Sequence, residues 1–155
     1  MIRAVICDDE DAALKIITYS IENQGIPIEI VGTASDGKEA LALIKKENPN
    51  LVFLDIEMPG MNGFDVVEKL NAVNCKVIII TAYSTFSYAQ RALRLGVSDI
   101  IEKPIDTDTL KEAIQRAIGW EFTGNEALNK ALFYIHTHYW EKIELEILAE
   151  EACCT

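Results

Sequence analysis

The residues best suited to chemistry in this chain of 155 residues each follow a short aliphatic run. The pair Asp8-Asp9 follows residues 4–7, and Asp55 follows residues 51–54. If these runs are adjacent strands, the carboxylates come within a few ångströms of one another, and ionising all of them is costly unless a cation sits among them. Oxygen ligands with room for water suit Mg²⁺, which also binds phosphate oxygens. The pattern predicts a magnesium site formed by Asp8, Asp9 and Asp55.

Two further polar residues at the ends of such runs could bind the oxygens of a phosphoryl group. Thr81 follows residues 77–80, and Lys103 follows residues 99–102. A carboxylate such as Asp55 can attack a phosphoryl group to form an aspartyl phosphate, and this transfer depends on charge neutralisation and in-line positioning. Mg²⁺ can cover one phosphoryl oxygen, the Lys103 ammonium another and the Thr81 hydroxyl a third, while backbone amides after Asp55 add donors. The residues therefore predict a site that binds one phosphoryl group.

Alternating strand and helix patterns surround these residues. Continuous aliphatic stretches predict buried strands at residues 4–7, 28–31, 51–54, 77–80 and 99–102. Apolar residues at helical spacing predict helices at about residues 11–24, 40–47, 64–70, 86–95 and 106–119. Five such units favour an α/β fold with a doubly wound parallel sheet. Sheets of this kind bind ligands at the carboxyl ends of their strands, where the polar residues fall.

Composition narrows the classes of function. Apolar residues make up 50% of the chain and charged residues 25%, as in an ordinary globular protein. The net charge of -11, without a Lys/Arg cluster, argues against nucleic-acid binding by this chain alone. No apolar run approaches the roughly 20 residues that cross a membrane, and a signal-peptide pattern is missing, so we expect a cytoplasmic protein without a membrane partner. The cysteines lack metal-type spacing, and we assign them no role.

The pattern changes in the last part of the chain. Gly124-Asn125 is a predicted hinge, after which apolar residues at helical spacing over residues 127–135 and from Leu145 onward predict two short helices. Two short helices cannot build a core, so this tail must pack on the domain or on a second chain, or belong to something longer. We therefore divide the chain into a domain at residues 1–120 and a tail at residues 121–155.

The order and spacing of these motifs resemble those of a bacterial response-regulator receiver domain over about residues 1–120. The matching features are Asp8-Asp9, Asp55 followed by Met-Pro-Gly-Met-Asn-Gly at residues 58–63, Thr81-Ala82, Gly96 and Lys103-Pro104. Any one of these residues alone has an ordinary explanation, such as a helix cap or a solvated lysine, but the full set in strand context is far more specific. The resemblance implies a flavodoxin-like sheet of five parallel strands in the order 2-1-3-4-5.

The resemblance also implies roles for the acidic residues. Asp55 would be the phosphoacceptor. Asp9 and Asp55 would bind Mg²⁺ directly, Asp8 would act mostly through water, and the main-chain carbonyl of Glu57 would be the third protein ligand. Mg²⁺ is accordingly the expected cofactor.

On the phosphate side, the resemblance makes Thr81 and Lys103 the pair that senses the phosphoryl group, and the Lys103-Pro104 peptide bond is often cis in this family. Receivers commonly carry Tyr or Phe three residues before the lysine, as a switch side chain, but this chain has Ile100 there. Three nearby aromatic residues are alternative carriers of the signal: Tyr83, Phe86 and Tyr88.

By this resemblance, Asp55 accepts its phosphoryl group from a sensor histidine kinase, because neither histidine of the chain matches a kinase phosphorylation motif. Phosphorylation would shift the conformational population, and the face formed by the fourth helix, fifth strand and fifth helix would then bind a partner or a second copy in a homodimer. The domain would be a signalling module that assists its own phosphorylation and dephosphorylation, and not an enzyme in the usual sense.

The tail resembles the start of an AraC-type helix-turn-helix region at residues 131–139 and 143–149. The recognition helix of that family would lie beyond Thr155, so the resemblance implies a transcription regulator that binds DNA only through a part missing here. His136 and His138 lie too far from any acidic pair in sequence to suggest a metal site.

Two other functions are compatible with parts of the pattern. A pseudo-receiver that serves only for dimerisation would explain Ile100 in place of the aromatic switch. A phosphatase with an Asp nucleophile, of the haloacid-dehalogenase kind, would place that nucleophile after the first strand in a DxD pattern. Here the first strand is followed by Asp8-Asp9-Glu10 and the isolated aspartate follows the third strand, which argues against the phosphatase.

Overall fold

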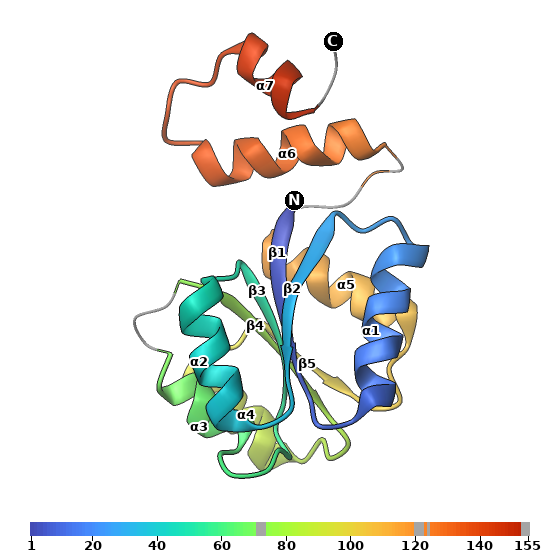
Figure 1. Ribbon diagram of the computed structural model, residues 1–155, viewed down its shortest axis with the longest axis vertical. Coiled ribbons are helices and arrows are strands. Elements are labelled where there is room, and N and C mark those ends of the chain that lie inside the picture. The colour runs from blue at the N-terminus through green and yellow to red at the C-terminus, as the bar shows by residue number, and fades with distance from the viewer. Residues whose placement is uncertain (71–73, 120–122, 124, 153–155) are drawn as a thin grey trace.

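The computed structural model describes residues 1–70, 74–119, 123 and 125–152. Its centre is a parallel sheet of five strands in the order β2-β1-β3-β4-β5, with helices on both faces (Figure 1). The strands are β1 (Ile2–Cys7), β2 (Ile28–Ala34), β3 (Leu51–Asp55), β4 (Lys76–Thr81) and β5 (Asp99–Glu102). This arrangement confirms the predicted doubly wound, flavodoxin-like α/β fold.

The central strands are covered on both faces, which explains their uninterrupted aliphatic sequences. Along β1, Ile2, Ala4 and Ile6 pack into one core, while Val5 and Cys7 pack into a second core on the opposite face. The helices that complete the first core are α1 (Asp11–Asn23) and α5 (Thr107–Ile118). The helices that complete the second are α2 (Gly37–Glu47), α3 (Gly63–Glu68) and α4 (Phe86–Leu95).

Local sequence signals set the ends of these helices. Four polar side chains accept hydrogen bonds from first-turn amides: Asp36, Asn62, Thr85 and Asp106. Gly96 ends α4 with a φ of 71°, a conformation that glycine adopts readily. The helix predicted to include Leu70 ends earlier, at Glu68, because the chain tightens there and the Leu70 amide donates to the Val67 carbonyl. Leu70 is still buried in the second core.

The tail forms α6 (Glu126–His138) and α7 (Leu145–Glu151), in agreement with the apolar spacing. Helix α6 lies across the amino-terminal end of the sheet, opposite the strand ends that carry Asp8 and Asp55 (Figure 1). Leu132 and Phe133 of α6 pack against the core shared by α1 and α5. The tail therefore rests on the domain, which is one of the arrangements that the sequence left open.

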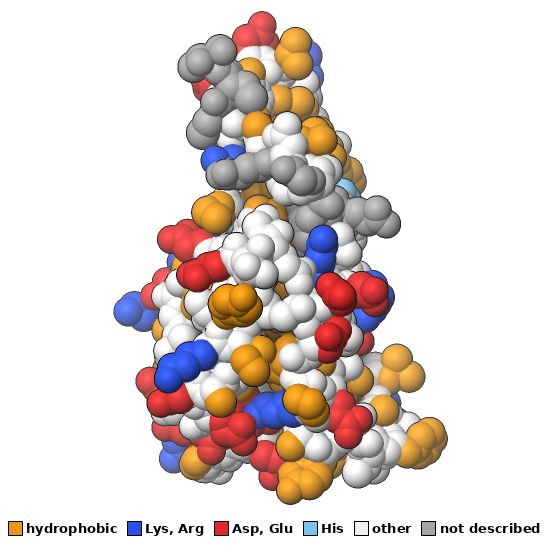
Figure 2. Space-filling view, turned by 90° about the vertical axis from the view of Figure 1, so that its right-hand side faces the viewer, with side chains coloured by type: hydrophobic (Ala, Val, Ile, Leu, Met, Phe, Trp, Pro, Cys, Tyr) orange, Lys and Arg blue, Asp and Glu red, His pale blue; other side chains and the backbone are white. Residues whose placement is uncertain are grey.

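Asn125 of the predicted hinge caps α6 by accepting a hydrogen bond from the Leu128 amide, whereas Gly124 and the pair Cys153-Cys154 lie outside the described residues. Within the described ranges, no helix is both long and apolar enough to span a membrane. The side of the molecule seen in Figure 2 shows acidic, basic and hydrophobic side chains intermixed, without one broad basic patch.

Candidate functional site

Carboxylates gather at the carboxyl-terminal end of the sheet. Side-chain oxygens of Asp8, Asp9 and Asp55 lie within 4.8 Å of one another. Asp55 ends β3, and Asp8 and Asp9 follow β1; the two strands are neighbours, with Cys7 beside Leu54. Asp8 and Asp55 are only 2% and 3% exposed, whereas Asp9 faces solvent. Because parallel strands end at the same edge of a sheet, the register alone brings these side chains together.

Backbone groups orient two of the carboxylates. The Glu10 amide donates to Asp8 Oδ1 at 2.9 Å, and the Glu57 amide donates to Asp55 Oδ1 at 3.3 Å. The loop after Asp55 then folds back on the end of β3. A Cβ at Gly63 would collide with the main-chain oxygen of Asp55. Glycine at this position therefore permits the close approach of the loop to the phosphoacceptor candidate.

Lys103 reaches this acidic cluster across the sheet, since β3 and β4 separate β5 from β1. Its Nζ lies 2.9 Å from Asp8 Oδ2 and 3.4 Å from Asp55 Oδ2. A third carboxylate oxygen, Oε2 of Glu10, lies 3.5 Å from the same nitrogen. Glu10 was not predicted as a site residue, although its place directly after the Asp pair was a signal. The Lys103-Pro104 peptide bond is cis, as the resemblance implied.

Burial and charge alter the proton affinity of the site. Burial, followed by the charge of Asp8, raises the pKa of Asp55 to about 6, and Lys103 offsets only part of this increase. Burial lowers the pKa of Lys103, but the close contact with Asp8 and the charges of Asp55, Asp8 and Glu10 outweigh this effect, so that the pKa of Lys103 is raised overall. One ammonium group thus faces several carboxylates, and the site has an excess of negative charge.

The donor set fits a hard divalent cation. All the grouped side-chain ligands of Asp8, Asp9 and Asp55 are carboxylate oxygens, which Mg²⁺ prefers. Asp8 Oδ2 is buried and accepts no well-aligned hydrogen bond from the described residues, although the Lys103 ammonium lies against it. A buried carboxylate oxygen without an aligned donor is costly unless another positive partner approaches it. The excess negative charge and this oxygen are consistent with a cation among the three aspartates.

Thr81 lies at the edge of the same site but faces its own loop. It ends β4, whose residue Ile80 pairs with Asp55, and it is fully buried. The Thr81 hydroxyl oxygen accepts a hydrogen bond from the Tyr83 amide at 3.2 Å and lies 3.4 Å from the Tyr83 carbonyl. The structure thus brings Asp8, Asp9, Asp55 and Lys103 together and holds Thr81 beside them, with its hydroxyl engaged by the loop before α4.

The candidate signal residues differ in their contacts. Ile100 packs against the second core as a partly buried aliphatic residue. Tyr83 and Phe86 are 63% and 80% exposed. The Tyr83 backbone contacts Thr81, whereas Tyr88 reaches the site through its side chain: its hydroxyl donates to Glu57 Oε1 at 2.9 Å, which raises the pKa of Tyr88. No local sequence pattern predicted this pairing between residues 31 positions apart.

Comparison with known proteins assigns the chain to a family. Residues 4–115 match the model of the response regulator receiver domain. The transcriptional regulatory protein HptR of Staphylococcus aureus strain N315 is 35% identical over 118 residues, which are 76% of this chain and 47% of HptR. A response regulatory protein of Staphylococcus epidermidis is 35% identical over 114 residues, which are 74% of this chain and 45% of that protein. The chain thus spans about half the length of the curated relatives it matches.

Solved structures show the same fold. A DNA-binding response regulator of the LuxR family from Staphylococcus aureus aligns with a TM-score of 0.70 and 31% identity, covering 76% of this chain and 98% of that chain. The receiver domain of AraT, a response regulator from Geobacillus stearothermophilus, aligns with a TM-score of 0.68 and 36% identity, covering 75% and 92%. CheY in a complex with CheX, beryllofluoride and Mg²⁺ from Borrelia burgdorferi aligns with a TM-score of 0.67 and 28% identity, covering 74% and 87%.

Receiver domains are signalling domains, generally not enzymes, and they interact with histidine kinases. The fold, the acidic cluster at the carboxyl end of the sheet and the match over most of the chain agree with one another. The chain belongs to the response regulator receiver domain family of two-component systems.

Proposed function

We propose that this chain accepts a phosphoryl group on Asp55 from a sensor histidine kinase, in a reaction that depends on Mg²⁺. The observation that carries the proposal is the buried contact of the Lys103 ammonium with Asp55 and Asp8, inside a cluster of carboxylates. A nucleophilic carboxylate with a fixed cation beside it is suited to phosphoryl transfer, which depends mainly on positioning and charge stabilisation.

In this reaction an Asp55 oxygen attacks phosphorus as the bond from phosphorus to the kinase imidazole breaks, and the imidazole leaves. Lys103 stabilises the negative charge of one phosphoryl oxygen, and the Thr81 hydroxyl donates to another. Asp9, Asp55 and the Glu57 main-chain carbonyl would hold Mg²⁺, with Asp8 acting mostly through water. When bound, the ion neutralises the carboxylates and the phosphoryl oxygens. The domain thereby assists its own phosphorylation and, with water as acceptor, its dephosphorylation.

The output of the site is a shift of conformation at α4. To donate to a phosphoryl oxygen, the Thr81 hydroxyl must turn its hydrogen away from the Tyr83 carbonyl, which lies 3.4 Å from it, and the state that makes this new contact is favoured by phosphorylation. The exposed side chains Phe86 and Leu93 on α4 provide apolar area for a homodimer through the α4–β5–α5 face.

The tail suggests a second part of the function. We assign residues 1–120 to the receiver and residues 121–155 to a linker and the start of an AraC-type helix-turn-helix domain, on the resemblance of residues 131–139 and 143–149. The relatives extend well beyond the matched region, and HptR is named as a transcriptional regulator. In a longer regulator of this kind, phosphorylation of the receiver would change promoter binding by a DNA-binding region.

Phosphorylation with a small donor tests the central proposal. Acetyl phosphate and Mg²⁺ should add one phosphoryl group to the intact chain, detected by mass spectrometry, and Asp55→Asn should abolish the addition. Equal phosphate uptake by Asp55→Asn would reject the assignment of the phosphoacceptor.

Size measurements test the output. Gel filtration with beryllofluoride and Mg²⁺ should show a larger species than gel filtration without them. A protein that is phosphorylated but does not change in size would favour the pseudo-receiver alternative, for which Ile100 is the supporting observation.

A further inference from the structure

Helix α4 is attached to the domain by few buried side chains. Ala92 is its buried residue, while Phe86 and Leu93 are 80% and 81% exposed. An element with little buried apolar area can move at low free-energy cost. The position of α4 therefore depends on the contacts that its partly exposed side chains make with neighbouring elements.

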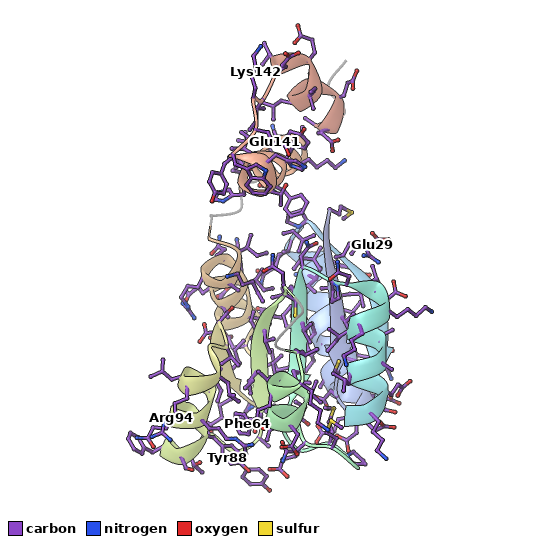
Figure 3. The ribbon with its side chains drawn as sticks, turned by 90° about the vertical axis from the view of Figure 1, so that its left-hand side faces the viewer. Glu29, Phe64, Tyr88, Arg94, Glu141 and Lys142 are labelled. Carbon is purple, nitrogen blue, oxygen red and sulfur yellow. The ribbon has the colours of Figure 1, made fainter. Side chains whose placement is uncertain are left out.

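Two of those side chains hold α4 against α3. The Tyr88 ring meets the Phe64 ring edge-on, with centroids 5.4 Å apart, and the Arg91 guanidinium lies 4.7 Å from the centroid of the same ring. Arg91 also donates to Glu68 at 2.9 Å. Phe64 is 1% exposed and belongs to the second core, so it is a fixed anchor. Figure 3 shows Tyr88 and Phe64 at the end of the molecule that carries the site.

One contact of α4 leads directly into the site. The Tyr88 hydroxyl donates to Glu57 Oε1 at 2.9 Å, and the Glu57 amide donates to Asp55 Oδ1 at 3.3 Å. Among the described residues, this hydrogen bond joins α4 to the loop that follows Asp55. Tyr88 is thus separated from the candidate phosphoacceptor by a single residue, which contacts both.

We propose that Tyr88 is a positioning residue that couples the occupancy of Asp55 to the position of α4 through Glu57. This inference rests on the proposed function and specifies how the site is read. A cation or phosphoryl group on Asp55 competes for the carboxylate oxygen that now accepts the Glu57 amide. Glu57 then changes position, and the Tyr88 hydrogen bond transmits this change to α4. The aliphatic Ile100 has no polar group with which to perform this role.

The coupling also acts in the opposite direction, because coupling between two sites is reciprocal in binding free energy. Removing the Tyr88 hydroxyl should therefore alter the affinity of the site as well as the response of α4. For one hydrogen bond at a partly exposed position, the expected change in the apparent Kd for Mg²⁺ is about twofold to fivefold.

Amide NMR of the intact chain, titrated with Mg²⁺ and then with beryllofluoride, tests the inference. Tyr88→Phe removes the hydroxyl and keeps the ring on Phe64. Tyr19→Phe on α1, where the ring is 61% exposed, is the matched control. In the wild-type and control proteins, beryllofluoride should shift the amides of Asp55, Glu57 and residues 86–95. In Tyr88→Phe, the shifts at Asp55 and Glu57 should persist, while those over residues 86–95 should fall by more than half.

The outcomes separate this inference from the function on which it rests. A full response of residues 86–95 in Tyr88→Phe, equal to that of Tyr19→Phe, would overturn the coupling and leave the phosphoacceptor assignment intact. The lack of any response at Asp55 and Glu57 in the wild-type protein would overturn both. A merely structural role of Tyr88 would lower the stability of the variant without reducing the α4 response relative to the response at Asp55.

Discussion

The two ends of the sheet differ in what they bury: charged side chains at the carboxyl end and apolar side chains at the amino end. At the carboxyl end, Asp8 and Asp55 are buried, and Lys103 is the ammonium group that lies against both. At the amino end, α6 lies over the strands and contributes the apolar side chains of Leu132 and Phe133 to the core. Burying carboxylates is costly unless they are fully compensated, whereas burying apolar area stabilises the fold.

The contrast suggests that the amino end contributes mainly to the stability of the fold, whereas the candidate functional site lies at the carboxyl end. At the amino end, α6 covers the strands with apolar side chains that pack against the core. The carboxyl end keeps carboxylates close together, and burial, followed by the charge of Asp8, raises the pKa of Asp55. We expect a bound cation to relieve the repulsion between these carboxylates, so that the unfavourable arrangement would favour binding of a cation or of a cation-bound phosphoryl group.

The largest expected effect concerns Lys103. Replacement by alanine removes the ammonium that lies 3.4 Å from Asp55 Oδ2, and the rate of phosphorylation by acetyl phosphate should fall about 100-fold or more, as for other losses of a charge-stabilising group. Mass spectrometry over time measures this rate. The control is Lys15→Ala, an exposed lysine on α1, which should react like the wild-type protein. A Lys103→Ala rate within twofold of the wild-type rate would contradict the proposed role.

The second prediction uses the raised pKa of Asp55. A carboxyl whose folded pKa of about 6 exceeds its unfolded value favours folding only while it is protonated. Its contribution is complete below about pH 4 and is lost as the pH rises through 6. Without metal, Asp55→Asn should therefore be more stable than the wild-type protein at pH 7.5, by roughly 2 to 3 kcal/mol, and equal to it below pH 4.

Urea unfolding at both pH values measures this difference, and added Mg²⁺ should stabilise the wild-type protein in preference to Asp55→Asn. The control is Asp106→Asn, since hydrogen bonds from the Thr109 amide and hydroxyl lower the pKa of this exposed helix cap. That variant should show no gain at pH 7.5. If Asp55→Asn is instead less stable than the wild-type protein at pH 7.5 without metal, the ionised Asp55 carboxylate does not destabilise the folded protein, and the prediction is wrong.

The third prediction concerns the amino end. Phe133 is partly buried against the core, so Phe133→Ala should lower the free energy of unfolding by about 1 to 2 kcal/mol. The phosphorylation rate should be unchanged, because the site lies at the other end of the sheet. Tyr139→Ala is the control, with a ring that is 75% exposed. A change of more than twofold in the phosphorylation rate of Phe133→Ala would show that the two ends are coupled.

The smallest expected effect is at the cap of α6. Asn125→Ala removes the side-chain acceptor of the Leu128 amide and should cost about 1 kcal/mol or less. Faster hydrogen exchange of that amide measures the local effect. Asn125→Asp keeps an acceptor and should exchange at the wild-type rate, and equal exchange in Asn125→Ala and Asn125→Asp would show that the cap does not hold α6.

Much of the fold could be predicted because its signals are local. Aliphatic runs marked all the strands, and the helix predicted at about residues 86–95 has the observed bounds, with Gly96 at its end as expected and Thr85 as its amino-terminal cap. The early end of α3 was missed, since the apolar spacing continues to Leu70 although the backbone closes in a tight turn there, with the Leu70 amide donating to the Val67 carbonyl. The grouping of Asp8, Asp9 and Asp55 could be predicted from the positions of the strand ends alone. The contacts of longer side chains, such as that of Lys103 with Asp8 and that of Tyr88 with Glu57, could not.

The sequence by itself determined which polar residues follow which strands, because apolar periodicity, caps and glycines act within a few residues of the chain. The tertiary structure decided what those residues touch. It placed the Lys103 ammonium against Asp8 across two intervening strands and paired Tyr88 with Glu57. It also turned the Thr81 hydroxyl to its own loop. Such contacts depend on strand order and on the packing of distant helices, and no local pattern encodes either.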